Sequence, residues 1–117
     1  MATKDDGVMR VFDGGATRDT SGGKNDYGGF LSPEVLIAFG DFMRRHQVQP
    51  DGSIRDPGNW KHGMPTRVCL ESGMRHWIDI WMELDGNESR EGMDEALGGA
   101  FFNIMALWYN LIQEAKK

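Results

Sequence analysis

The sequence predicts an all-α protein, because apolar side chains recur at helical spacing and chain-breaking residues fall between the helical segments. Three segments carry the helical pattern, residues 33–46, 66–84 and 89–115. Glycine and proline gather elsewhere: seven of the 16 glycines lie within residues 1–30, and the four prolines begin or interrupt segments between residues 33 and 65. We therefore expect a glycine-rich arm over residues 1–30 and one helical domain over residues 31–117, a bundle of three main helices.

Composition limits the classes of partner. A formal net charge of -5 argues against stable nucleic-acid binding, which usually requires a basic surface. The single cysteine, Cys69, excludes an intrachain disulfide framework. Neither a secretory signal nor an apolar run of membrane-spanning length appears, so we expect a cytoplasmic protein that does not contact membranes.

The arm over residues 1–30 is expected to be mostly loop, because its glycines are mixed with polar residues and show no apolar period. Gly22-Gly23-Lys24 resembles a phosphate-binding loop in composition, but it lacks the spacing of one and no strand pattern precedes it. Lys24 and Arg18 are thus either phosphate ligands or ordinary solvated charges.

The first helix is expected to begin at Pro33, since Ser32 can cap it and Glu34 complements the dipole at its amino end. Glu34 and Asp41 lie on one side of this helix, two turns apart. They form either an ordinary solvated face or an acidic wall for a divalent cation.

Residues 47–64 are expected to form a long loop, because prolines and glycines interrupt every regular pattern there. Loops of this length in compact domains are often functional. This one holds Trp60 and Lys61 side by side, an aromatic face and a cation that suit a base and its phosphates. The alternative is that Trp60 only anchors the loop on the helices.

The second helix, residues 66–84, combines an apolar seam with a polar stripe. The seam is Leu70, Trp77, Trp81 and Leu84, and the stripe is Ser72, His76, Asp79 and Glu83. His76 and Asp79 are candidate catalytic residues, one turn apart. The alternative is a solvated face in which Arg75 pairs with Asp79.

The third helix is expected to run from a Ser89 cap through residue 115. One side carries small residues and amides, including Asn103, which indicates either close packing of another helix or recognition of a ligand. The expected core of the bundle is Phe39, Trp77, Trp81, Phe101, Trp108 and Leu111. Aromatic residues on more than one side of this helix indicate a homodimer or higher oligomer that completes the core.

The available chemistry is that of hard oxygen ligands. Carboxylates occur on all three expected helices, and such ligands suit Mg²⁺ or Mn²⁺, ions that favour hydrolysis of a phosphoanhydride. Zinc is disfavoured, because the chain lacks a cysteine pair and a His-Glu-x-x-His pattern.

Several stretches together resemble a phage-associated family of dATP/dGTP diphosphohydrolases, related to the all-α MazG-like nucleotide pyrophosphohydrolases. They are Gly15-Ala16-Thr17-Arg18-Asp19, Gly23-Lys24-Asn25-Asp26-Tyr27, Leu31-Ser32-Pro33-Glu34, Gly58-Asn59-Trp60-Lys61-His62-Gly63-Met64-Pro65, Arg75-His76 with Asp79 and Trp81, Asp94-Glu95-Ala96-Leu97, and Phe102-Asn103. The resemblance implies metal-dependent hydrolysis of purine deoxynucleoside triphosphates to monophosphate and pyrophosphate, in a host cytoplasm if the chain is phage-encoded.

The paired Glu-x-x-Glu and Glu-x-x-Asp patterns of the wider MazG-like group are not intact, because Ile37 follows Glu34 and Gly98 follows Glu95 at those offsets. The candidate metal ligands are therefore Glu34 and Asp79, followed by Asp41 and Glu95. The candidate substrate-binding residues are Trp60, Asn103, Lys24, Lys61, Arg75 and Arg18. A non-catalytic phage accessory protein that binds a nucleotide or a protein partner is the alternative.

Overall fold

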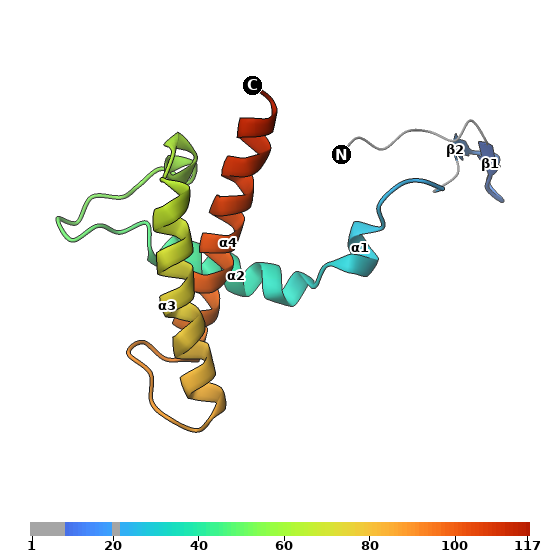
Figure 1. Cartoon of the computed structure of the whole chain (residues 1–117). Helices are drawn as coiled ribbons and strands as arrows, with labels where there is room; N and C mark the ends of the chain where they lie inside the picture. The colour runs from blue at the N-terminus through green and yellow to red at the C-terminus, as the bar shows by residue number, and fades with distance from the viewer. Residues whose placement is uncertain (1–8, 20–21) are drawn as a thin grey trace. The chain divides into compact units, whose positions relative to one another are not determined.

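A computed structural model describes residues 9–19 and 22–117 and divides the chain into two compact units, Met1–Pro33 and Glu34–Lys117. Helices dominate the described residues, and the strands are limited to one short pair (Figure 1). This confirms the all-α class. Within the described ranges, no helix is both long and apolar enough to cross a membrane.

The amino-terminal unit contains a small hairpin and one helical turn. Strand β1 (Met9–Val11) pairs antiparallel with β2 (Thr17–Asp19), and α1 (Tyr27–Phe30) is capped by Asp26, whose carboxylate accepts from the Gly29 amide at 3.1 Å. The sequence predicted mostly loop here and did not identify these elements, because three-residue strands and a one-turn helix are too short to leave a periodic signal. Gly15, at φ +88°, supplies the turn that joins the strands.

The second unit is built on α2 (Pro33–Arg45), a 3₁₀ turn η1 (Asn59–His62), α3 (Thr66–Leu84) and α4 (Met93–Ala115). The bounds of α3 are those expected from the sequence. The third expected helix begins four residues later than predicted. Ser89 does not cap it: the Ser89 hydroxyl accepts from the Gly92 amide at 3.0 Å in a turn, and Gly92 at φ +84° separates that turn from α4.

Helices α3 and α4 lie side by side and pack through small residues (Figure 1). The buried residues are Cys69, Asp79 and Ile80 on α3 and Ala96, Gly98, Gly99, Ala100, Asn103 and Ala106 on α4. The stripe of small residues is therefore a helix-packing surface. Close approach follows because these side chains add little thickness between the two backbones.

Most of the large residues that were expected in the core are exposed in the structure. Trp77, Trp81 and Trp108 are 61%, 58% and 66% exposed in the single chain, and Phe101 and Leu111 are also exposed. The reason is that the polar stripe of α3, rather than its apolar seam, faces α4 and the segment 85–92, which folds back along α3.

Helix α2 attaches to α4 through aromatic side chains. The Phe39 and Phe101 ring centroids are 4.4 Å apart, and Phe42 is buried against Gly98. A Cβ at Gly98 would overlap the Phe42 ring, so only glycine allows this contact without movement. This contact brings the carboxyl end of α2 to the amino end of α4, where the candidate site lies.

Candidate functional site

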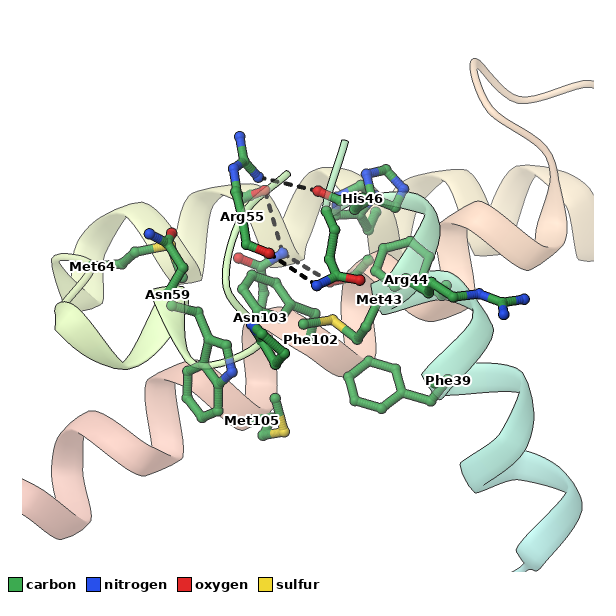
Figure 2. A pocket seen from close by; sticks show the side chains of 18 of the residues that line it. Phe39, Met43, Arg44, His46, Arg55, Asn59, Met64, Phe102, Asn103 and Met105 are labelled. Atoms are coloured by element: carbon green, nitrogen blue, oxygen red, sulfur yellow. Dashed lines mark hydrogen bonds between the residues drawn. The ribbon is translucent and has the colours of Figure 1, made fainter. Parts of the chain in front are cut away.

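A pocket of about 920 Å³ lies between α2, the 47–65 loop, α3 and α4 (Figure 2). This volume is within the range of small-molecule sites. Its apolar wall includes Phe39, Met43, Trp60, Met64, Phe102 and Met105. Its polar wall includes His76, Glu91, Glu95 and Asn103. An apolar cavity with a few polar groups is the usual form of a ligand site.

Each side chain of the polar stripe of α3 has a hydrogen-bond partner on α4 or in the segment 85–92. Asn103 Nδ2 lies 3.4 Å from Ser72 Oγ, His76 Nδ1 lies 2.5 Å from Glu91 Oε1, and the Ser89 hydroxyl donates to Glu83 Oε1 at 2.9 Å. The fourth member, Asp79, pairs with Arg90. The alternative of a solvated face with an Arg75 pair was therefore wrong, because α4 and the segment 85–92 cover this face.

His76, Asp79 and Glu91 form a cluster of potential metal ligands. One ligand atom from each lies within 4.8 Å of the others, and in residues 9–19 and 22–117 this is the one such group of three or more. Asp79 is only 4% exposed. An imidazole and two carboxylates can hold a divalent cation, and the nitrogen ligand suits Mn²⁺ better than Mg²⁺.

Arg90 already supplies positive charge to this cluster. Its Nε lies 3.2 Å and 3.0 Å from the two Asp79 oxygens, and its Nη2 also donates to Oδ2. Hydrogen bonding from Arg90 lowers the pKa of Asp79, against the opposing effect of burial. The Arg90 side chain is 59% exposed, so its guanidinium can move into solvent when another cation takes its place.

The position of His76 depends on Gly99. A Cβ at Gly99 would lie 2.5 Å from the His76 ring, so the absent side chain leaves the space that the imidazole occupies. His76 and Asp79 were identified from the sequence by their spacing on one helix face. Glu91 and Arg90 were missed as site residues, because their approach depends on how the segment 85–92 folds back, which local spacing does not specify.

The four metal ligands proposed from the sequence do not converge. Of these, Asp79 belongs to the cluster, whereas Glu34 and Asp41 are exposed on α2 and do not line the pocket. Glu95 lines the pocket, but it accepts from Arg45 Nη2 at 2.8 Å and lies 2.6 Å from His46 Nε2. Glu95 therefore joins α4 to α2 and has no part in the three-residue cluster.

This ion pair makes stability depend on pH. The hydrogen bond from His46, followed by that from Arg45, lowers the pKa of Glu95 in the folded state. A lowered pKa means that the stabilisation is complete above the ordinary glutamate pKa, 4.5, and is lost as pH falls through the folded value. We expect the melting temperature to fall more steeply below pH 4.5 in the wild type than in Glu95→Gln. Parallel pH profiles of the two melting curves would contradict this.

Of the six substrate residues proposed from the sequence, Trp60 and Asn103 line the pocket and the other four do not. Trp60 lies in η1, lines the pocket, and packs edge-on against Tyr109 with ring centroids 5.0 Å apart. It thus also anchors the loop on α4, as the alternative required. Lys61 Nζ lies 5.6 Å from the Trp60 ring centroid, and Arg75 is exposed on α3 outside the pocket lining. Lys24 and Arg18 are exposed residues of the amino-terminal unit.

Comparisons of the chain with protein-family models, with curated proteins and with solved structures found no match. The function of the site is therefore inferred from its own residues. It belongs to an all-α protein in which a largely apolar pocket adjoins a cluster of one imidazole and two carboxylates.

Proposed function

We propose that the protein is a metal-dependent hydrolase that converts purine deoxynucleoside triphosphates, dGTP or dATP, to the monophosphate and pyrophosphate. One observation carries the proposal. His76 and Glu91 belong both to the candidate metal cluster and to the wall of the pocket. A cation held by these residues would therefore face a ligand bound in the pocket.

Different residues of the chain would bind the base, bind the phosphates and hold the cation. Trp60 and Phe102 offer aromatic surface to the base. The Lys61 ammonium, 5.6 Å from the Trp60 ring centroid but outside the pocket lining, is a candidate cation for phosphate oxygens. His76 Nδ1 is held by Glu91, while Nε2 has no hydrogen-bond partner among the described residues. A neutral imidazole has one lone-pair nitrogen, so a His76 that binds the cation would act as a ligand and by orienting Glu91. Bound Mg²⁺ or Mn²⁺ would supply charge stabilisation for the phosphates and a lowered pKa for water.

A second candidate function is non-catalytic binding of a nucleotide or a protein partner. Arg90 favours it, because its guanidinium engages both oxygens of Asp79 and offsets the charge of that carboxylate without a metal ion. In that case the pocket would bind nucleotide without turnover.

Product analysis separates the two functions. The purified protein is incubated with each of the four deoxynucleoside triphosphates in Mg²⁺, Mn²⁺ or Co²⁺, and pyrophosphate and monophosphate are measured. We expect equal amounts of both products from a purine nucleotide, with chelation stopping the reaction. Nucleotide binding without pyrophosphate release in any of the three metals would support the binding protein instead.

The exposed apolar seam of α3 supports the proposal of a homo-oligomer. Trp77, Trp81 and Leu84 are each more than half exposed, and a second copy of the chain would remove them from water. We expect light scattering to give at least twice the chain mass of 13.2 kDa, and Trp81→Asp to lower it. A mass near 13.2 kDa at micromolar concentration would contradict the proposal.

A further inference from the structure

Asn103 is a nearly buried amide in the wall of the pocket. The residue is 7% exposed and lines the cavity, where Figure 2 labels it close to Phe102. Its Nδ2 donates to the Gly99 carbonyl oxygen at 2.8 Å and lies 3.4 Å from Ser72 Oγ. Because a carbonyl oxygen accepts only, the bond to Gly99 fixes which end of the amide is nitrogen.

The other end of the amide, Oδ1, accepts no hydrogen bond from any described residue. No described buried side-chain nitrogen or oxygen lacks a partner, so Oδ1 must be reachable, and the pocket is the cavity that Asn103 lines. A nearly buried acceptor of this kind selects a ligand that carries an N–H or O–H donor. It disfavours phosphate oxygens, which are acceptors themselves.

The purine bases differ in the donors that they offer to one oxygen. Guanine carries two adjacent donors on its Watson–Crick edge, N1–H and the N2 amino group, and one oxygen can accept from both. Adenine carries one amino group beside an acceptor nitrogen, and its usual pairing with asparagine also needs the side-chain NH₂ as a donor. In this chain the two hydrogens of that NH₂ are already donated, one to the Gly99 carbonyl oxygen and one to the Ser72 hydroxyl.

We propose that Asn103 Oδ1 accepts hydrogen bonds from N1–H and the N2 amino group of guanine, and that the pocket therefore prefers guanine to adenine nucleotides. The inference rests on the proposed function for the class of ligand, a purine deoxynucleotide. It goes further by naming the base and the atom that selects it.

Binding of monophosphates tests the inference without any hydrolysis. Calorimetry on the wild-type protein compares dGMP with dIMP, which lacks the N2 amino group, and with the purine deoxyribonucleoside monophosphate, which lacks both donors. We expect affinity to fall in that order, by about tenfold over the series. We expect dAMP to bind about tenfold more weakly than dGMP. Equal affinities across the series would overturn the inference even if the protein hydrolyses purine triphosphates.

Substitution of the selecting residue gives a second test. Asn103→Leu should weaken dGMP by about tenfold and make the four ligands nearly equal. Asn110→Leu is the matched control: Asn110 lies on the same helix, donates to the Met64 carbonyl oxygen at 2.7 Å and does not line the pocket. It should leave the ligand order unchanged. If Asn103→Leu does not fold, the wild-type ligand series stands alone.

Adenine could bind instead if the Ser72 hydroxyl, beside Asn103, took part in recognition of the base. Ser72 also lines the pocket and can donate to N1 of adenine while Asn103 accepts from its amino group. A wild-type preference for dAMP that disappears in Ser72→Ala would overturn the assignment to guanine. A preference for dGMP that survives in Ser72→Ala would support it.

Discussion

Asp79→Asn is expected to lower metal-dependent turnover by about 100-fold or more and to weaken Mn²⁺ binding in parallel. The amide keeps the shape of the carboxylate but removes the negative charge from the most buried member of the cluster. Pyrophosphate release measures the first effect, and titration of the protein with Mn²⁺, in the absence of nucleotide, measures the second.

The fold is expected to survive this substitution. The Arg90 side chain is 59% exposed, so its guanidinium can be solvated once Asp79 no longer attracts it. Asp94→Asn is the matched control, because Asp94 is exposed at the start of α4 and lies outside the cluster. Normal turnover and Mn²⁺ affinity in Asp79→Asn, together with a lower melting temperature, would show that Asp79 serves only to hold Arg90.

Trp60→Ala is expected to raise KM by about tenfold with a smaller change in kcat, because the indole offers stacking surface for the base in the pocket. A moderate fall in melting temperature should accompany it, since the ring also packs against Tyr109 and Phe102. Steady-state kinetics and thermal unfolding are measured on the same preparation.

Trp60→Phe separates the two roles of this residue. A phenyl ring retains an aromatic face and much of the contact with α4, so both KM and melting temperature should lie between the wild type and the alanine variant. If KM is unchanged in Trp60→Ala while the melting temperature falls sharply, the residue is a loop anchor and the base lies elsewhere.

The helical class and the bounds of α3 could be predicted from the sequence, because helical spacing and chain-breaking residues act locally. The helix ends where Asp85 and Gly86 stop it, and Gly86 takes the φ of +83° that ordinary residues avoid. The start of α4 was less predictable. Ser89 has the chemistry of a cap, but its backbone amide and hydroxyl turn toward Glu83 instead.

The candidate site was predicted in part. The spacing of His76 and Asp79 placed both on one face of α3, and Trp60 and Asn103 were selected for their side-chain chemistry. All four either line the pocket or belong to the metal cluster. Glu34 and Asp41 were selected by the same reasoning, but the described structure leaves both exposed on α2.

By itself, the sequence determined that α3 would carry one apolar seam and one polar stripe, since both follow from the helical period. Which of these faces would be covered was decided by the tertiary structure. Gly99 lets His76 approach α4, and the fold-back of the segment 85–92 brings Arg90 and Glu91 to Asp79 and His76. These partners hydrogen-bond the polar stripe, and Arg90 offsets the charge of Asp79, so this face can be covered. The tryptophans of the seam stay exposed in the single chain.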